Sequence, residues 1–159
     1  MDEPPIEIER LVDDSVLPAT IATLQFAYWG ALTGYDTALG YEEFLQNAAR
    51  SARLPTVLVA RRGTMYMGSV NLLASEMMIR PALSPWMAQL FVINSARGRR
   101  VGSALIEALM GCAIELGYQR VHLFTSGTLP TYYAALGWKP IEEVEYLGKM
   151  RTVMAIDLP

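Results

Sequence analysis

The sequence predicts an α/β (α+β) fold in which helices pack against a mixed sheet. The first observation is a change of hydrophobic period: apolar residues recur at helical spacing in the N-terminal part and alternate with polar residues from Thr56 onward. The second is the order strand, helix, strand from Leu90 to Thr125, which is typical of a parallel βαβ unit. An antiparallel meander precedes this unit, so we expect both strand directions in one sheet.

Composition favours one domain and disfavours several kinds of partner. With 159 residues, 52% of them hydrophobic, the chain can bury one sizeable core, and we expect a single domain over residues 1–159. No apolar run approaches the ~20 residues of a membrane span. The net charge of −3 argues against nucleic acid as a partner. One histidine and one cysteine are too few for an ordinary zinc site, so no metal is expected.

A cytoplasmic location is expected from the N-terminal segment and the cysteine content. The first residues are acidic and include two prolines, unlike the basic and then apolar start of a signal peptide. The single cysteine, Cys112, cannot form an internal disulfide. The oligomeric state is left open, with a homodimer as one option.

The N-terminal third is expected to contain one strand and two helices. Ile6–Arg10 alternates apolar and charged residues, as a half-buried strand does. Leu17–Leu32 has an apolar helical face, which stops at the turn Gly34–Asp36. A second helix is predicted over Tyr41–Arg50, because two glutamates would then lie in its first turn, where the helix dipole favours negative charge.

The middle of the chain is expected to form the meander and the longest helix. Strands are predicted over Thr56–Arg62, Met65–Ala74 and Ala88–Asn94. A turn at Gly63 joins the first two. Apolar residues then recur on one helical face over Val101–Leu116, and Gly117 follows, where helices often end with glycine.

The C-terminal part repeats the alternation of strand and helix. A strand is predicted over Arg120–Thr125, and a short helix over Thr131–Leu136 that Gly137 ends. The last predicted element is a strand over Arg151–Leu158.

The segment Gln89–Leu105 predicts an anion site, because a basic, glycine-containing turn lies between a strand and the start of a long helix. The first amides of a helix lack intrahelical partners, and the helix dipole adds positive potential there. Gly98 and Gly102 allow close backbone approach. The arginines of the turn, Arg97, Arg99 and Arg100, add charged donors for phosphate. The turn therefore predicts a diphosphate ligand.

Two common diphosphate sites are disfavoured, since the chain has neither a GxxxxGK[ST] motif nor GxGxxG after a strand. The turn instead resembles the GNAT superfamily of N-acetyltransferases, whose phosphate motif [Q/R]xxGx[G/A] follows the fourth strand. Arg97 and Gly102 occupy the two ends of that motif, and Arg100 replaces its inner glycine. A residue with a side chain is acceptable at this position if its φ is negative, and an arginine there could itself reach a phosphate of coenzyme A.

The resemblance extends over about Thr56 to Trp138. The segment Pro85–Val92 is similar to the fourth strand of small-molecule members, and Thr131–Trp138 to their closing helix. It implies a mainly antiparallel sheet with a parallel, splayed strand pair and helices on both faces. The resemblance also implies a role for Tyr133, which lies four residues before Gly137 at the end of the closing helix. This tyrosine would protonate the departing thiolate of coenzyme A.

Acetyl-CoA is the cosubstrate that the resemblance implies. Family members have a bulge in the fourth strand, and the pantetheine arm binds beside it like an added strand. The expected cofactor-binding residues are Leu90, Phe91, Val92, Arg97, Gly98, Arg99, Arg100, Val101, Gly102 and Ser103. The mechanism implied is direct attack of a neutral amine on the thioester, without a metal. Glu76 is our candidate for the general base, and Gln89 could orient a water.

Several other residues are interpreted as structural. His122 lies within a predicted strand, and Cys112 lies on the apolar helix face. Trp29, Trp86 and Tyr35 could line an acceptor pocket, with Met65, Met67, Met77 and Met78 as adaptable walls, but ordinary packing is the default for each.

The sequence thus predicts an acetyl-CoA-dependent N-acetyltransferase whose acceptor is the primary amine of a small molecule. Protein lysine or N-terminal amines are a less favoured class of acceptor. A second hypothesis is a module of the same fold that binds coenzyme A without turnover, and Arg100 in place of glycine is its best support. A third takes Ser95–Arg100 as a docking loop for nucleic acid or a partner, which would require further basic residues around it.

Overall fold

The computed structural model describes residues 4–13 and 16–159. Seven strands form one sheet in the order β1-β2-β3-β4-β5-β7-β6. The strands are β1 (Ile6–Arg10), β2 (Thr56–Arg62), β3 (Met65–Leu73), β4 (Trp86–Val92), β5 (Arg120–Thr125), β6 (Lys139–Tyr146) and β7 (Lys149–Asp157). Neighbouring strands are antiparallel except β4 and β5, which are parallel. The predicted mixed sheet is confirmed.

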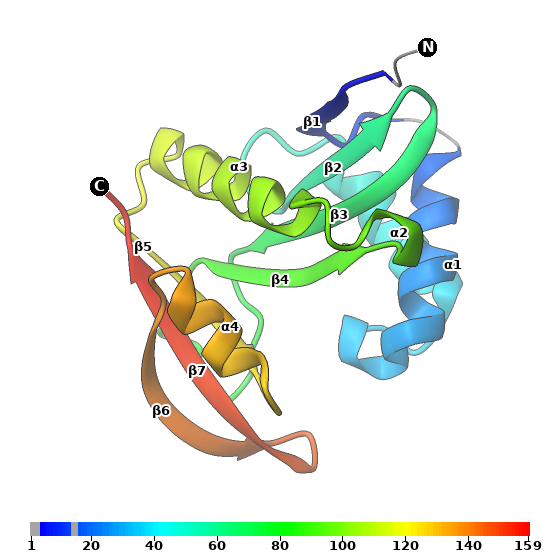
Figure 1. Ribbon diagram of the computed structural model, residues 1–159. Coiled ribbons are helices and arrows are strands. Elements are labelled where there is room, and N and C mark those ends of the chain that lie inside the picture. Colours follow the sequence, from blue (N-terminus) through cyan, green and yellow to red (C-terminus); the bar gives the residue numbers. More distant parts are fainter. Residues whose placement is uncertain (1–3, 14–15) are drawn as a thin grey trace.

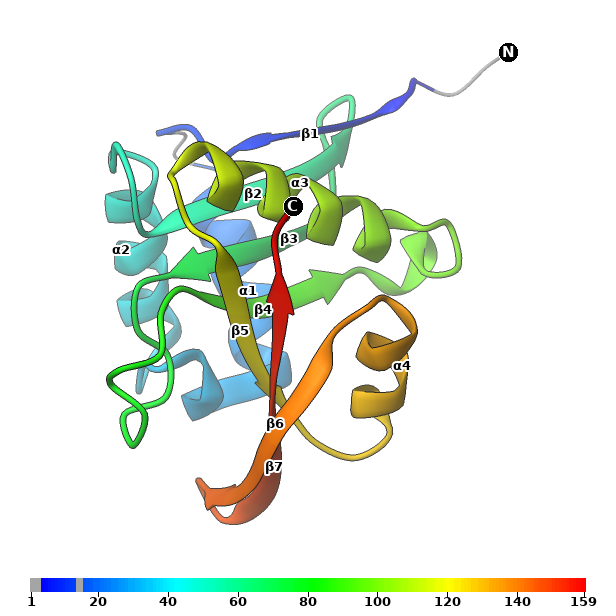
Figure 2. The same cartoon turned by 90° about the vertical axis from the view of Figure 1, so that its left-hand side faces the viewer.

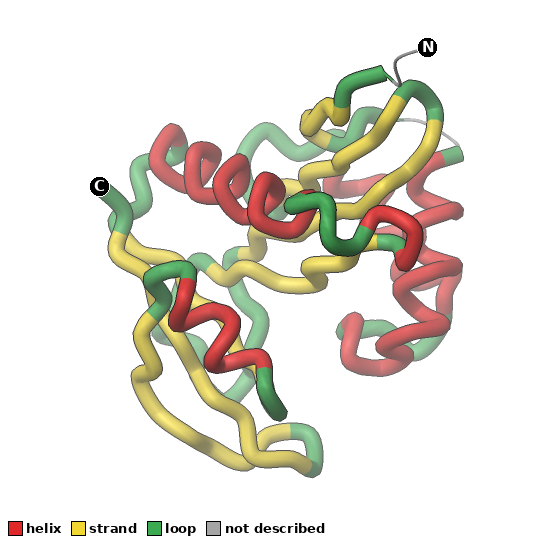
Figure 3. Tube along the Cα trace, viewed as in Figure 1, coloured by secondary structure: helices red, strands yellow, loops and turns green. Residues whose placement is uncertain are grey.

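Helices cover both faces of this sheet (Figure 3). They are α1 (Leu17–Trp29), α2 (Ala38–Ala48), α3 (Val101–Glu115) and α4 (Leu129–Ala135), with short 3₁₀ turns at Gly30–Thr33 and Asn94–Ala96. Figure 1 shows α3 in front of β2, β3 and β4, and α2 behind them. No helix in the described ranges is long and apolar enough to cross a membrane.

The core consists of two main layers, one on each side of β2 and β3. Residues of α3 pack on one face, with Leu105 and Leu109 among the buried side chains, and Tyr133 of α4 belongs to the same cluster. Residues of α1 and α2 pack on the other, where Ile21 and Leu45 are fully buried. Because both faces are covered, β3 is buried along nearly its whole length.

Several predicted boundaries are wrong by a few residues. The second helix starts at Ala38 rather than Tyr41, because the Thr37 hydroxyl accepts a hydrogen bond from the Gly40 amide at 3.0 Å and caps it. The first helix ends at Trp29, and the predicted segment to Leu32 continues as a 3₁₀ turn. The fourth strand begins at Trp86 and ends at Val92, before the 3₁₀ turn that contains Asn94.

One strand was not predicted at all. The edge strand β6 contains Pro140 and three glutamates, so it lacks the apolar alternation that marks a half-buried strand. Proline and exposed charge are typical of edge strands, which have one unpaired side. The hairpin with β7 turns at Leu147 and Gly148, both with positive φ, so β7 begins at Lys149 and not at Arg151.

The approach of β3 to β4 yields a stability prediction at Gly68. A Cβ atom at this position would lie 2.5 Å from the Phe91 carbonyl oxygen and 3.4 Å from Leu105. We expect Gly68→Ala to lower the free energy of unfolding by about 2 kcal/mol or more, because backbone must move to admit the methyl group. Denaturant unfolding measures the change.

Gly111 is the matched control for this substitution. It lies exposed on α3, and an added Cβ meets nothing within 4 Å. Gly111→Ala should raise the free energy of unfolding by up to about 1 kcal/mol, since alanine favours the helix. Wild-type stability in Gly68→Ala would contradict the close approach.

Candidate active site

The parallel strands β4 and β5 stay together at one end only. Trp86 and His122 form their single register pair in the described part of the chain. The His122 amide donates to the Pro85 carbonyl at 2.9 Å, and its ring nitrogen Nδ1 lies 3.1 Å from the same oxygen. Burial lowers the pKa of the His122 imidazole, so a neutral ring holds this junction. Beyond it the strands diverge, as Figure 2 shows.

A bulge in β4 accompanies the divergence. Ser69 pairs with Phe91 and Asn71 pairs with Ala88, so β4 contains one more residue than β3 over this interval. Gln89 lies at the bulge with a φ of +48°, a left-handed conformation that is uncommon for a residue with a side chain. The fourth-strand bulge that the resemblance implied is present.

Backbone groups of β4 beyond the bulge face the space next to β5. The Ile93 amide donates to the Met67 carbonyl of β3 at 3.0 Å. Because backbone groups alternate along a regular strand, the Val92 amide points the other way, toward β5. Arg97 reaches this side, where its Nε donates to the Val92 carbonyl at 3.3 Å. An extended ligand could therefore pair with this edge of β4.

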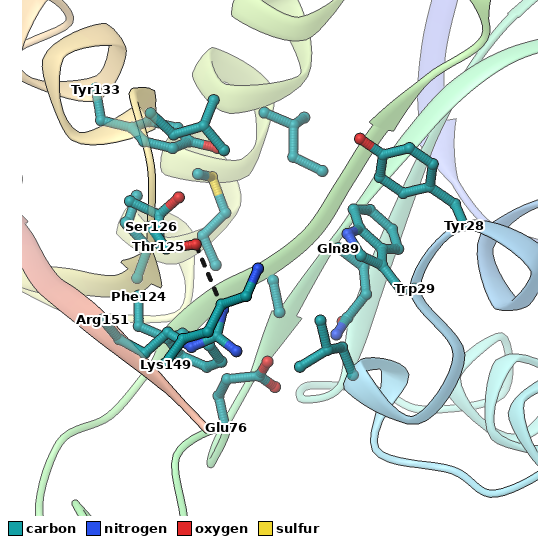
Figure 4. A pocket seen from close by; sticks show the side chains of 16 residues that line it. Tyr28, Trp29, Glu76, Gln89, Phe124, Thr125, Ser126, Tyr133, Lys149 and Arg151 are labelled. Carbon is teal, nitrogen blue, oxygen red and sulfur yellow. Dashed lines mark hydrogen bonds between the residues drawn. The ribbon is translucent and has the colours of Figure 1, made fainter. Parts of the chain in front are cut away.

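A cavity of about 410 Å³ lies where β4 and β5 separate (Figure 4). Its walls come from distant parts of the chain: the end of α1, the loop after β3, the bulge in β4, the end of β5, α4 and the start of β7. The lining residues used below are Tyr28, Trp29, Glu76, Gln89, Leu90, Phe124, Ser126, Tyr133, Lys149 and Arg151.

Tyr133 of α4 lines this cavity and is 8% exposed. Its ring packs edge to face against Tyr132, with centroids 5.1 Å apart, and against Trp138 at 6.2 Å. Burial, with a smaller effect from Tyr132, raises the pKa of its phenol to about 12. The hydroxyl is therefore protonated at neutral pH and can donate a proton. Tyr132 is 41% exposed and does not line the cavity.

Glu76 lies on the opposite side of the cavity from Tyr133 (Figure 4). It belongs to the loop that follows β3, three residues after the strand ends at Leu73. Burial raises the pKa of its carboxyl group to about 7, and a hydrogen bond with the Gln89 side chain opposes this rise. A carboxyl group with this pKa exchanges its proton near neutral pH, as a general base must.

Gln89 is held by a chain of buried polar side chains. Its Oε1 accepts from Asn71 Nδ2 at 3.0 Å, and the same nitrogen donates to the Tyr41 hydroxyl at 3.1 Å. Tyr41 donates to Gln25, which is fully buried and donates to Ser69 at 2.8 Å. With Oε1 engaged by Asn71, the Gln89 amide nitrogen is available to donate to Glu76.

The arginine turn adopts a conformation that differs from the prediction. Arg97, Gly98, Arg99 and Arg100 are all exposed. Arg100 has a φ of +62° and a ψ of 21°, so the condition of a negative φ is not met. The inner glycine of the GNAT phosphate motif would adopt this left-handed conformation without strain. An arginine in the same conformation carries a conformational cost of roughly 1–2 kcal/mol. The turn nevertheless forms, and Val101 begins α3 directly after it.

The first amides of α3 remain outside its hydrogen-bond ladder. The first intrahelical bond runs from the Ala104 amide to the Arg100 carbonyl at 3.1 Å, so the amides of Val101, Gly102 and Ser103 have no partner within the helix. A Cβ atom on Gly102 would lie 3.7 Å from the Tyr132 hydroxyl and 3.8 Å from Val92. The helix start therefore lies beside the end of β4 and α4, next to the cavity, which residues 97–103 do not themselves line.

Sequence reasoning missed a large part of this cavity. Lys149 and Arg151 enter it from β7, Phe124 from β5 and Tyr28 from α1. Their contribution depends on a strand order that the amino-acid pattern does not reveal. Of the aromatic residues considered for a pocket, Trp29 lines it.

The other aromatic and methionine candidates lie elsewhere. Trp86 is fully buried, and the Tyr35 ring packs at a tilt against the rings of Tyr41 and Phe44. None of the four candidate methionines lines the cavity. No group of three or more His, Cys, Asp or Glu side chains that could hold a metal occurs in the described residues.

Comparison with known proteins identifies the fold. No family model matches the sequence, and no curated protein matches it significantly. Solved structures do match along the whole chain. A GNAT-family acetyltransferase from Streptococcus pneumoniae is similar with a TM-score of 0.67 and 19% identity, covering 98% of this chain and 100% of the other.

Two similar structures contain coenzyme A or acetyl-CoA. An aminoglycoside 6′-N-acetyltransferase complexed with coenzyme A has a TM-score of 0.75 and 15% identity, over 95% of this chain and 96% of the other. YncA from Salmonella typhimurium, with its cofactor acetyl-CoA, has a TM-score of 0.70 and 15% identity, over 97% and 94%. The mixed seven-stranded sheet, the splayed parallel pair and these full-length matches together show that the chain has the fold of the GNAT family of acetyltransferases.

Proposed function

We propose that the chain, as a single domain over residues 1–159, is an N-acetyltransferase that moves the acetyl group of acetyl-CoA to a primary amine of a small molecule. The observation that carries this proposal is the cavity between the splayed strands β4 and β5, with Glu76 and Tyr133 on opposite walls. Its volume of about 410 Å³ lies within the usual range for small-molecule sites. The single cysteine favours the cytoplasm as the location.

The residues around the β4 edge and the α3 start fit acetyl-CoA. The unpaired side of Leu90, Phe91 and Val92 would pair with the extended pantetheine arm. The turn Arg97–Arg100 and the amides of Val101–Ser103 would hold the phosphates, since helix starts and arginines both favour anions. The cofactor supplies an activated thioester, whose carbonyl the β4 amides would polarise.

Glu76 is proposed as the general base. Its ionised carboxylate takes the proton that the attacking amine loses, directly or through a water, while the new N–C bond forms. The hydrogen bond with Gln89 keeps the carboxylate at the cavity wall. Its pKa of about 7 lets it accept a proton at neutral pH without remaining protonated.

Tyr133 is proposed as the general acid. As the C–S bond breaks, the phenol would give its proton to the thiolate leaving group. Its high pKa ensures that the proton is present before the reaction. Base and acid on opposite walls suit a direct transfer, because the amine that enters and the thiolate that leaves occupy different positions on the acetyl carbon.

Binding of acetyl-CoA is the first test, with Gly102→Asp as the diagnostic variant. Saturation at about 100 Kd adds ~2.7 kcal/mol to the stability of the wild type and should raise Tm by roughly 5–10 °C. Gly102→Asp should lose most of this shift, because its carboxylate repels phosphate at the helix start. The free variant should stay folded, since negative charge in the first helical turn is favourable.

Gly102→Ala is the control for this variant. The position has ordinary room for a methyl group, and the resembling motif accepts glycine or alanine there. It should keep most of the thermal shift. A wild type that shows no shift at millimolar acetyl-CoA would refute the proposal.

Tyr133→Phe tests the proton donor and separates an enzyme from a coenzyme A sensor. The variant should keep the thermal shift with acetyl-CoA, because the ring still packs against Trp138. Thiol release with a reactive amine should fall by about 10²-fold or more, as expected when a general acid is lost. Unchanged turnover would remove Tyr133 from the mechanism. Absence of turnover in the wild type with every amine, together with a normal shift, would favour the sensor.

Glu76→Gln tests the base through pH. In the wild type, kcat/KM should rise with pH through about 7, where Glu76 loses its proton. Glu76→Gln should be slower by at least about 10²-fold and should lack this rise. A wild-type pH profile in the variant would assign the titration to another group.

The same variant has an independent signature in stability. Burial raises the Glu76 pKa from its ordinary value of 4.5 to about 7, so between these values the folded state retains a proton that the unfolded chain has lost. Stability should therefore fall as pH rises through this window. Glu76→Gln should be more stable than the wild type by about 3 kcal/mol at pH 8, with the difference vanishing near pH 4.

A further inference from the structure

The cavity wall formed by β7 contains a buried cation without an acidic partner. Arg151 is 7% exposed, and no acidic side chain of the described residues forms an ion pair with it. Arginines elsewhere do have such partners, for example Arg80 with Glu142 and Arg120 with Asp157. An unpaired buried charge is costly, so a structure that retains one often uses it for a ligand.

Neutral groups hold Arg151 in place. Its Nε donates to the Tyr146 carbonyl at 3.0 Å, and the two other nitrogens lie 3.5 Å from the Ser126 hydroxyl and the Leu147 carbonyl. The guanidinium carbon lies 5.9 Å from the centre of the Phe124 ring. These contacts fix the orientation of the side chain but do not neutralise its charge.

Lys149 adds a second cation to the same wall. It lies two residues before Arg151 on β7, so both side chains emerge on one face of the strand. Figure 4 shows Lys149 and Arg151 on the β7 side of the cavity, with Tyr28 and Trp29 on the opposite side. Glu76 is the only acid among the lining residues, and it forms no ion pair with either cation.

We propose that the acceptor is an amine that also carries a carboxylate or similar oxyanion, which Lys149 and Arg151 bind while Glu76 receives the amine proton. This inference rests on the proposed function, because it names the acceptor of the same site. The aromatic walls of Tyr28, Trp29 and Phe124 favour an acceptor with a flat apolar body between its two polar groups. Polycationic amines are disfavoured, since their charges would meet Lys149 and Arg151.

The test uses pairs of amines that differ only in a carboxylate: tyrosine with tyramine, phenylalanine with phenethylamine, and 4-(aminomethyl)benzoate with benzylamine. Spermidine is the polycation. Thiol release gives kcat/KM for each amine, and thermal shift in the presence of coenzyme A gives binding without turnover. In at least one pair, the carboxylate-bearing amine should be preferred about 10-fold or more by both measurements.

Lys149→Ala assigns the preference to this wall. It should lower the preference severalfold by raising KM for the acidic amine, with KM for acetyl-CoA and for the neutral amine unchanged. Lys149 is exposed, so the variant should fold. Arg151→Lys keeps the positive charge but loses the paired N–H donors of the guanidinium group. It should therefore raise KM for the acidic amine in the same way. Lys139→Ala, an exposed lysine of β6 outside this cavity, is the matched control and should behave as wild type.

Three outcomes would overturn the inference. Equal binding and turnover within every pair is one, and a preference for spermidine is another. A rise in KM for acetyl-CoA alone in Lys149→Ala would assign the cations to the cofactor. A carboxylate preference in binding, without any thermal shift by coenzyme A, would refute the proposed function and leave Lys149 and Arg151 as a binding site for acidic amines.

Discussion

The separation of β4 from β5 is the constraint on which the candidate site depends. Parallel neighbours normally pair along their length, which would leave no space between them. Here the Pro85, Trp86 and His122 junction keeps the strands together at one end, while the bulge at Gln89 bends β4 away at the other. The cavity, the unpaired backbone edge and the inward direction of Tyr133 all result from this opening.

The opening is supported by buried polar groups that would be unfavourable if left unpaired. The hydrogen bonds from Gln89 through Asn71 and Tyr41 to Gln25 connect the bulge to the layer under α1 and α2. A left-handed conformation at Gln89 is tolerated because these bonds fix its side chain. The same bonds orient the amide next to Glu76. Strain at the bulge and placement of the carboxyl group are therefore parts of one arrangement.

The distribution of charge separates the cavity from the rest of the surface. The chain as a whole is acidic, with a net charge of −3, yet the cavity wall has two cations and one acid. A second set of cations lies at the arginine turn, where Arg100 keeps a left-handed conformation that glycine would adopt more easily. The two sets are separate, because Lys149 and Arg151 line the cavity and the arginines of the turn do not.

The sequence alone determined the mixed sheet, most helices and strands, and the turn before α3. These features depend on local patterns, namely the period of the apolar residues, the glycines that end helices, and a run of arginines next to a helix start. It missed β6, whose proline and glutamates suit an edge but carry no apolar alternation. It also gave no sign that Lys149 and Arg151 lie opposite Tyr28 and Trp29. Those residues meet only because β7 inserts beside β5, and long-range strand order is decided by packing of the whole sheet, not by any segment of the chain.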